Sequence, residues 1–265
     1  MNLLESFIYG LLSGFTEILP ISAEAHQEIF KRLFGMEGDP NTVNLLVHIS
    51  VFVVLIVNCY PDFRVQRSIS HRGKRPRLSA DSRLVRTAAV PLILGFLLVR
   101  YVRYLGDQLP ILSLMLILNG LILYVPCRML QGNKTARAMS GWDGLLLGVT
   151  GIAGIIPGIS RIGTLVSVGT ARGAERSQAL KWAFDLTIIA LCAVIIMDFV
   201  VLFQDGTGVG VGFIRCIIAM VGAASGGYLG IKLLRYLAVK IGFSGFAFYC
   251  WGLSLFSFVM YLTVV

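Results

Sequence analysis

The chain has 265 residues, of which 56% are hydrophobic and only 14% are charged. A soluble domain has about 25% charged and about 45–50% apolar residues, so this composition excludes a disordered chain, a fibrous repeat and an ordinary water-soluble enzyme. The length accommodates about eight apolar segments of roughly 20 residues each, which is the length that crosses a bilayer. We therefore expect an all-α protein that crosses a membrane several times.

The charged residues favour one orientation in the membrane. The net charge is +9, and residues 61–86 alone carry eight basic residues against two acidic ones. Because short loops rich in lysine and arginine stay in the cytoplasm, we expect 61–86 to be a basic cytoplasmic loop. This rule accounts for the positive charge of the whole chain, so nucleic acid is not an expected partner.

The apolar segments follow one another closely along the chain. They cover residues 3–21, 43–60, 87–105, 110–127, 144–170, 182–203, 211–231 and 243–265. The loops on both sides of 144–170 are basic and should both be cytoplasmic. This segment is therefore predicted to enter the membrane, break at Gly154, Pro157, Gly158 and Gly163, and return as a re-entrant hairpin.

The first segment has the same character as 144–170. Residues 3–33 are predicted to break around Gly14 and Pro20 and to form a second re-entrant hairpin. The chain then reads as one integral membrane domain, 1–265, built from two repeats, 1–127 and 142–265. Each repeat is a hairpin followed by three transmembrane helices, and the two repeats have inverted topology. In such folds the broken segments meet near the membrane midplane.

Ionisable side chains are concentrated in the first hairpin. Glu17, Glu24 and His26 lie within ten residues of one another. An ionisable group at the bilayer centre costs at least ~2.5–3.5 kcal/mol, so such groups normally face a cavity or a partner. The alternative is that Glu24, His26 and Glu28 form an ordinary hydrated helix start at the external surface.

The second hairpin has the residues of an anion site. A helix that begins after Pro157 would direct its positive end at the break. Arg161 adds a planar, permanently charged group suited to phosphate oxygens, while Ser160 and Thr164 add hydroxyl donors. The alternative is a simple kink in which Arg161 pairs with Glu17 for structural reasons.

Both hairpins resemble the bacitracin-resistance family of undecaprenyl-pyrophosphate phosphatases. That family has the motifs E-G-x-T-E-x-L-P-I-S-S-T-x-H and P-G-x-S-R-S-G-x-T. The residues that match them are Glu17, Pro20, Ser22 and His26 in the first, and Pro157, Gly158, Ser160, Arg161, Gly163 and Thr164 in the second. Residues 43–50, which include His48, are similar to a third stretch, so the resemblance extends over nearly the whole chain.

The resemblance implies hydrolysis of a polyprenyl (undecaprenyl) pyrophosphate to the monophosphate carrier lipid of cell-wall synthesis. The site would open to the external face of the bacterial inner membrane. The roles it implies are catalysis by His26, Glu17, Ser22 and Arg161, phosphate binding by Ser160, Arg161, Gly158, Gly163 and Thr164, and charge neutralisation by a divalent cation, Mg²⁺ or Ca²⁺.

The chain departs from the family motifs at several positions. The first glutamate of the family falls on Ser13, and its Ser–Thr pair falls on Ala23 and Glu24. Asp185 stands where the family is apolar. We therefore expect Glu24 and Asp185 to be replacement carboxylates, with a metal held by Glu17 and Glu24.

An incomplete set of acids also fits two other functions. One is a translocase that moves a polyprenyl phosphate or another anionic lipid across the bilayer, and the other is a non-catalytic protein that binds lipid phosphate.

Three further expectations concern residues within the apolar segments. His48 should face the interior or a neighbouring helix, and Asp198 should lie near the outer interface with Arg215 as its partner. The spacing Gly222–Gly226–Gly230 allows close helix contact, either within the monomer or in a homodimer.

Overall fold

The computed structural model describes residues 1–36, 41–70, 80–129, 132–204, 212–240 and 242–264, and most of these residues are helical. The helices are α1 (Leu3–Ile18), α2 (Ala23–Leu33), α3 (Asn41–Ser70), α4 (Ala80–Phe96), α5 (Val99–Val102), the 3-10 helix η1 (Arg103–Asp107), α6 (Leu109–Cys127), α7 (Gly141–Gly151), the 3-10 helix η2 (Ile152–Ile155), α8 (Arg161–Ala171), α9 (Arg176–Gln204), α10 (Phe213–Lys240) and α11 (Ser244–Val264).

Five helical segments among the described residues are long and apolar enough to cross a membrane. They are Asn41–Cys59, Leu109–Cys127, Arg176–Gln204, Phe213–Ala238 and Ser244–Thr263. The predicted all-α, polytopic membrane protein is thus confirmed. The predicted segment 87–105 differs from the others, because α4 ends at Phe96 and the chain continues through the short α5 and η1.

Much of the basic segment 61–86, which was predicted to be a loop, is helical. Helix α3 continues through Pro61 to Ser70, and α4 already begins at Ala80. The prediction of one continuous loop is therefore wrong for 61–70 and 80–86, and 71–79 lie outside the described residues. A proline within a helix removes one hydrogen bond, and the remaining turns of α3 continue past it.

The first hairpin consists of α1 and α2, joined by residues 19–22. Helix α1 begins with a capping box, in which Asn2 and Glu5 bond to each other's backbone N–H groups at 2.8 and 2.7 Å. Pro20 has no N–H, which favours ending the helix just before it. Gly14 does not break the helix as predicted. It lies inside α1, and a Cβ there would come 2.1 Å from the carbonyl oxygen of Ala223.

The second hairpin consists of α7, η2 and α8. Ser140 caps α7, and Ser160 caps α8 by accepting a hydrogen bond from the Gly163 N–H at 3.2 Å. Helix α8 therefore begins at Arg161, four residues after Pro157, and Gly163 lies within its first turn rather than in the break. The break between η2 and α8 covers residues 156–160.

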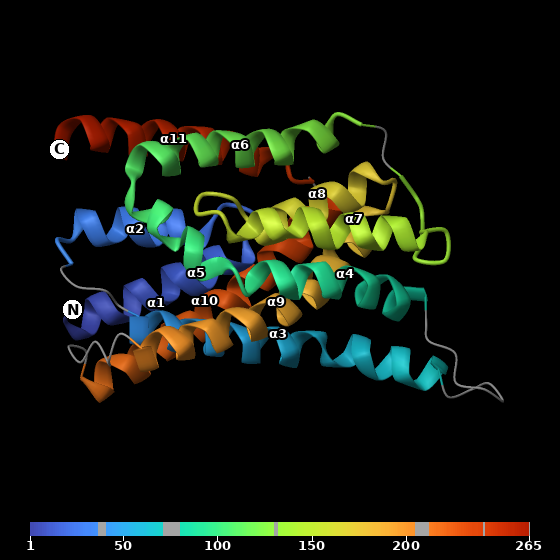
Figure 1. Ribbon diagram of the computed structural model, residues 1–265, viewed down its shortest axis with the longest axis horizontal. Coiled ribbons are helices and arrows are strands. Elements are labelled where there is room, and N and C mark those ends of the chain that lie inside the picture. The colour runs from blue at the N-terminus through green and yellow to red at the C-terminus, as the bar shows by residue number, and fades with distance from the viewer. Residues whose placement is uncertain (37–40, 71–79, 130–131, 205–211, 241, 265) are drawn as a thin grey trace.

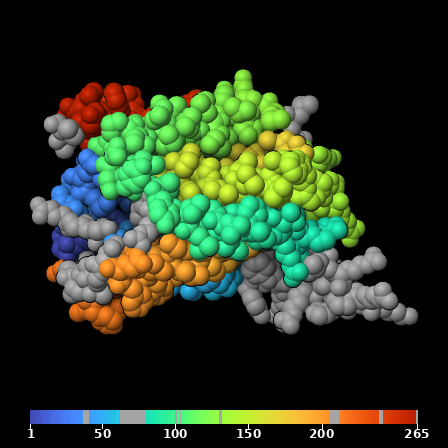
Figure 2. Space-filling view, in the orientation of Figure 1, coloured from blue at the N-terminus to red at the C-terminus, as the bar shows by residue number. Residues whose placement is uncertain are grey.

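The two hairpins enter the bundle from opposite ends of its long axis (Figure 1). Helix α1 packs on α10, and α7 packs on α4, while α3 contacts α9 and α6 contacts α11. Figure 2 shows α6, α7, α4 and α9 following one another across one face of the molecule. Helices from both halves of the chain thus alternate throughout the bundle.

The contact between α1 and α10 is very close. A Cβ added at Gly222 would lie 2.5 Å from the carbonyl oxygen of Phe7, and one at Gly226 would lie 2.2 Å from that of Leu11. The spacing Gly222–Gly226–Gly230 therefore serves packing within the monomer, where small residues let two backbones approach.

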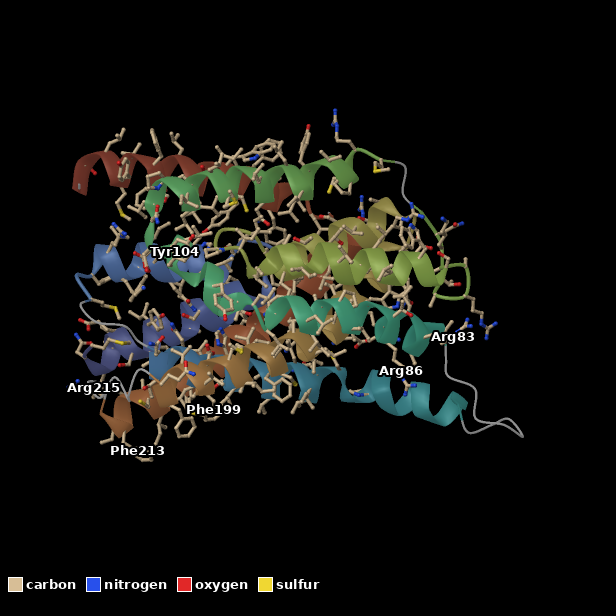
Figure 3. All side chains as sticks on the ribbon, viewed as in Figure 1. Arg83, Arg86, Tyr104, Phe199, Phe213 and Arg215 are labelled. Atoms are coloured by element: carbon tan, nitrogen blue, oxygen red, sulfur yellow. The ribbon has the colours of Figure 1, made fainter. Side chains whose placement is uncertain are left out.

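The two ends of the bundle differ in their side chains. Arg83 and Arg86 lie at one end, which we call the basic end, whereas Tyr104, Phe213 and Arg215 lie at the opposite end (Figure 3). The first hairpin enters from this opposite end, and the second enters from the basic end.

Candidate functional site

The tips of the two hairpins touch each other. The backbone N–H of Gly158 donates a hydrogen bond to the hydroxyl oxygen of Ser22 at 3.1 Å, and the hydroxyl of Ser160 donates to the carbonyl oxygen of Leu19 at 3.3 Å. Residues separated by more than 130 positions are thereby joined. The expectation that the two broken segments converge is confirmed.

Both tips contain backbone in an uncommon conformation. The φ angle is +66° at Ser22 and +95° at Gly158, and Ser22 is the sole described residue other than glycine with positive φ. Strained backbone of this kind costs of order 1–3 kcal/mol and persists where surrounding contacts hold it, often at functional sites. At Gly158 a side chain is also excluded by space, since a Cβ would lie 2.5 Å from that of Met115.

Asn119 of α6 holds the two tips together from a third element. Its amide nitrogen donates to the carbonyl oxygen of Pro20 at 3.0 Å, and its amide oxygen accepts from the backbone N–H of Ser160 at 2.9 Å. The side chain is fully buried. Sequence analysis did not identify this residue, although a lone asparagine within an apolar membrane helix is a polar group that needs partners.

A cavity of about 530 Å³ lies beside the joined tips. Five of the predicted site residues line it, namely Glu17, Ser22, Glu24, Ser160 and Arg161. The other polar lining residues include Asn41, Asn44 and His48 of α3, Glu28 and Lys31 of α2, and Tyr104 and Asp107 of η1. The walls thus come from both hairpins and from the helices that surround them.

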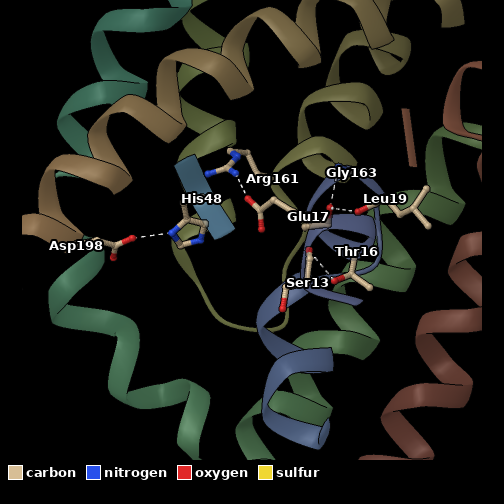
Figure 4. Close-up of polar contacts among 9 residues, drawn as sticks. Ser13, Thr16, Glu17, Leu19, His48, Arg161, Gly163 and Asp198 are labelled. Atoms are coloured by element: carbon tan, nitrogen blue, oxygen red, sulfur yellow. Dashed lines mark hydrogen bonds and ion pairs between the residues drawn. The ribbon is translucent and has the colours of Figure 1, made fainter. Parts of the chain in front are cut away.

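Arg161 and Glu17 form an ion pair across the two hairpins (Figure 4). Their side chains are only 8% and 13% exposed. The guanidinium group also lies over the ring of Phe96, with 5.1 Å between its carbon and the ring centroid. Within the described part of the chain, its Nε has no hydrogen-bond partner. Arg161 therefore places a permanent positive charge at the wall of the cavity, where an anionic ligand could contact it.

Both ring nitrogens of His26 contact other groups of the protein. Its Nδ1 lies 2.7 Å from the carbonyl oxygen of Ser22, and its Nε2 lies 2.7 Å from the hydroxyl of Tyr249 on α11. The two rings stack with centroids 5.6 Å apart. His26 is not among the residues that line the cavity. Because α2 turns this side chain toward α11, both of its ring nitrogens serve contacts within the protein.

The remaining predicted residues also lie away from the cavity wall. The hydroxyl of Thr164 donates to the carbonyl oxygen of Ser160 at 2.9 Å, and the N–H of Gly163 is used to cap α8. The N–H of Gly158 is bonded to Ser22. Asp185 is buried on α9 and does not line the cavity. The second motif therefore shapes the loop, and only Ser160 and Arg161 of its predicted phosphate ligands line the cavity.

Two ionisable residues of the crossing helices form a pair that the sequence did not predict. The Nδ1 of His48 lies 2.6 Å from a carboxylate oxygen of Asp198 on α9. The expectation that Asp198 pairs with Arg215 is thus wrong. The signal that identifies this pair is a polar face on an apolar helix, since Asn41, Asn44 and His48 follow each other at helical spacing.

The acidic residues of the cavity fit a cation that the substrate helps to bind. Among the described residues, no three His, Cys, Asp or Glu side chains are grouped as a protein-only metal site. Glu17 and Glu24 nevertheless line one cavity. Mg²⁺ is commonly held by one or two carboxylates together with substrate phosphates. This donor set is therefore compatible with Mg²⁺, and Ca²⁺ likewise prefers oxygen ligands.

The chain also matches a known protein family. The model of the family "Bacitracin resistance protein BacA" matches residues 6–256. The chain belongs to this family. BacA relatives include "Undecaprenyl-diphosphatase" of Halothermothrix orenii, which is 27% identical over 95% of each chain. "Undecaprenyl-diphosphatase 1" of Shouchella clausii is 28% identical over 98% of this chain and 96% of its own. "Undecaprenyl-diphosphatase" of Methanobrevibacter smithii is 28% identical over 99% of both.

Proposed function

We propose that this BacA protein is a membrane phosphatase that hydrolyses undecaprenyl pyrophosphate to the monophosphate. The family match over nearly the whole chain and the names of its relatives support this activity. The observation that carries the proposal is Arg161, a buried cation on the wall of a cavity. A pyrophosphate group supplies negatively charged oxygens that match such a cation.

The cavity residues have distinct roles in the proposed reaction. Arg161 would bind the phosphate oxygens and stabilise the charge of the transferring phosphoryl group, which is the main requirement of such reactions. Ser22 accepts hydrogen bonds from the backbone N–H groups of Gly158 and Ala25 at 3.1 and 3.5 Å. Its own hydroxyl proton can therefore be donated to a phosphate oxygen. Ser160 fixes the start of α8 and so the position of Arg161.

Glu17 and Glu24 are the residues that would hold a divalent cation, Mg²⁺ or Ca²⁺. Both line the cavity, and Glu17 already faces Arg161. When bound, the cation would neutralise charge on the two phosphates.

The arrangement of helices supports two inverted repeats, 1–127 and 142–265, within one domain. If α1, α3, α4 and α6 correspond to α7, α9, α10 and α11, the contact of α1 with α10 has its counterpart in the contact of α7 with α4. The contacts of α3 with α9 and of α6 with α11 then join equivalent helices. Buried residues of both halves also belong to one core, from Tyr9 to Cys250.

The cavity would open to the external face of the bacterial inner membrane. Tyr104, which lines it, lies at the end of the bundle away from Arg83 and Arg86 (Figure 3). Arg83 and Arg86 mark the basic end, which the positive-inside rule places in the cytoplasm. A homodimer remains a prediction.

The test is release of inorganic phosphate from undecaprenyl pyrophosphate by the purified full-length protein, with and without EDTA. We expect metal-dependent release that Arg161→Ala abolishes. Movement of labelled polyprenyl phosphate across vesicles without phosphate release would instead indicate the translocase, and binding alone would indicate the non-catalytic protein.

A further inference from the structure

The start of helix α3 contributes a side-chain amide to the cavity. Asn44 lines the cavity together with Glu17 and Arg161 of the two hairpins. Helix α3 begins at Asn41, so Asn44 lies near the end of the helix at which the backbone dipole is positive and favours a negative ligand. An amide at this position can donate hydrogen bonds without bringing a further charge into the cavity.

The amide of Asn44 is oriented by Tyr9 of α1. The hydroxyl of Tyr9 donates a hydrogen bond to Oδ1 of Asn44 at 2.6 Å. Tyr9 is fully buried and is not among the residues that line the cavity, so the amide oxygen is turned toward the protein interior. The amide nitrogen leaves the same carbon in a different direction, and Asn44 itself is only partly buried. The amide is therefore held with its two N–H groups on the cavity side.

Tyr9 is itself fixed by packing. Its ring lies against that of Phe30 on α2, with the two centroids 5.8 Å apart, and it belongs to the buried core. The bond to Asn44 also connects α3 to α1, the helix that carries Glu17. The orientation of the amide is thus set by the first hairpin before any ligand binds, which is the condition under which a hydrogen-bond donor is most effective.

The chemistry of the amide nitrogen selects the kind of ligand. An amide N–H is a donor and cannot coordinate a cation, so its partner must supply an acceptor oxygen. Figure 4 shows His48 beside the Arg161–Glu17 pair. Asn44 precedes His48 by one helical turn, about 6 Å along the axis. A pyrophosphate headgroup has two phosphoryl groups, so a headgroup held by Arg161 can also present an oxygen to Asn44.

We propose that Asn44 is a substrate-binding residue whose amide nitrogen donates a hydrogen bond to a phosphate oxygen of the pyrophosphate headgroup, and that Tyr9 is its positioning residue. The identity of the substrate rests on the proposed phosphatase function. Asn44 neither transfers a proton nor contacts the attacking water in this proposal. Its contribution is therefore present in the bound substrate and belongs to KM more than to kcat.

The experiment measures phosphate release by the full-length protein with Mg²⁺ and varied undecaprenyl pyrophosphate. It also measures inhibition by methylenediphosphonate, a non-hydrolysable analogue of the headgroup without the lipid chain. Asn44→Ala should raise KM and the inhibition constant together by about tenfold to 100-fold, as expected for a hydrogen bond to a charged group, and should change kcat by less than about threefold.

Asn58→Ala is the matched control on the same helix. The amide of Asn58 donates to the carbonyl oxygen of Val54 at 2.8 Å, and Asn58 does not line this cavity. That variant should keep the wild-type KM and inhibition constant. Thermal unfolding and size-exclusion profiles show whether each variant is folded.

Asn44→Asp separates ligand binding from a purely structural role. A carboxylate can still accept the hydrogen bond from Tyr9, so the connection between α1 and α3 is kept, but the N–H groups are lost and a negative charge faces the phosphates. We expect KM to rise more than in Asn44→Ala, with an unfolding temperature near that of wild type. Wild-type kinetics in this variant would show that Asn44 only holds the helices together, and a lower Mg²⁺ requirement would show that it faces a cation. Either result overturns the proposal.

Tyr9→Phe, made in wild type and in Asn44→Ala, tests the positioning role. The ring and its packing on Phe30 remain, and only the hydroxyl is lost. In wild type KM should rise by about threefold or more, whereas in Asn44→Ala it should not rise further, because Tyr9 acts through the amide. Equal effects in the two backgrounds would overturn the role of Tyr9.

The proposal and the phosphatase function can fail separately. An active wild type in which folded Asn44→Ala keeps the wild-type KM and inhibition constant overturns the proposal and leaves the phosphatase intact. If Asn44→Ala does not fold, Asn44→Asp decides in the same way. A wild type that releases no phosphate overturns the proposed function. Binding of labelled undecaprenyl pyrophosphate then tests Asn44 directly, and an unchanged Kd in Asn44→Ala overturns its role.

Discussion

The backbone N–H of Gly158 donates a hydrogen bond to the hydroxyl oxygen of Ser22, and the φ angles of the two residues are +95° and +66°. Each hairpin tip therefore supplies one residue in an uncommon backbone conformation to a single contact. Because Glu17 lies at the end of α1 and Arg161 at the start of α8, directly beside these tips, the position of both charges depends on this contact. Substitutions at the tips should therefore lower activity by displacing Glu17 and Arg161, and they should also lower the stability of the fold.

Gly158→Ala should reduce phosphate release more than tenfold and lower the unfolding temperature. A Cβ at this position would lie 2.5 Å from that of Met115 and 3.1 Å from the carbonyl oxygen of Leu112, in addition to the unfavourable φ. Gly252→Ala is the matched control, since nothing lies within 4 Å of its added Cβ. That variant should keep full activity, and alanine favours a helix over glycine by about 1 kcal/mol. Equal behaviour of the two variants would contradict this account.

Arg161→Lys should lower kcat/KM at least about 100-fold even though the charge is kept. Lysine lacks the planar group that can contact Glu17 and phosphate oxygens at the same time. Glu17→Gln should also reduce turnover, because it leaves the guanidinium group buried without its acidic partner. Phosphate release with varied substrate measures both effects. Wild-type kinetics in Arg161→Lys would show that a point charge is sufficient.

Glu24→Ala should raise the Mg²⁺ concentration needed for half-maximal turnover by at least about tenfold. Loss of one of two carboxylates weakens a site that is completed by substrate phosphates. Asp185→Asn is the matched control, because Asp185 is buried away from the cavity and should leave the Mg²⁺ requirement unchanged. If Glu24→Ala keeps the wild-type metal dependence, Glu24 does not replace the missing acid at Ser13.

The protein should lose stability at acidic pH in part because Asp143, near the start of α7, becomes protonated. Burial raises the pKa of this carboxyl, but hydrogen bonds from Ser140 and Arg172 more than offset burial and leave the pKa below its usual value of 3.8. Its stabilisation is therefore complete above that value and is lost as the pH falls below it. Asp143→Asn should flatten the fall in unfolding temperature that occurs as the pH drops below about 4. An unchanged fall would assign it to other groups.

The sequence predicted the architecture well because membrane insertion leaves a strong pattern in composition and charge. Long apolar segments were enough to identify the five described helices that can cross a membrane, whereas the predicted segment 87–105 is interrupted after Phe96. Helix boundaries were less accurate, since they depend on individual capping bonds. Ser160 caps α8 and moves its start to Arg161, and Gly14 fits inside α1 because Ala223 faces it.

The cavity was predictable only in part. Its contributions from the hairpins could be inferred because Glu17, Ser22, Ser160 and Arg161 belong to contiguous motifs. The direction in which a side chain points depends on how helices rotate against each other, which local sequence does not determine. For this reason the contact of His48 with Asp198 appears only once α3 and α9 are packed.

Tyr249→Phe separates a structural from a catalytic role of His26. The hydroxyl of Tyr249 lies 2.7 Å from Nε2 of His26, and its removal should lower the free energy of unfolding by about 1 kcal/mol. If His26 only fixes the first tip against α11, kcat should change less than about threefold, since the stacked rings remain. Tyr261→Phe, on the same helix, is the control for loss of a tyrosine hydroxyl. A loss of kcat of more than about tenfold in Tyr249→Phe, with no such loss in Tyr261→Phe, would show that catalysis depends on the contact between Tyr249 and His26.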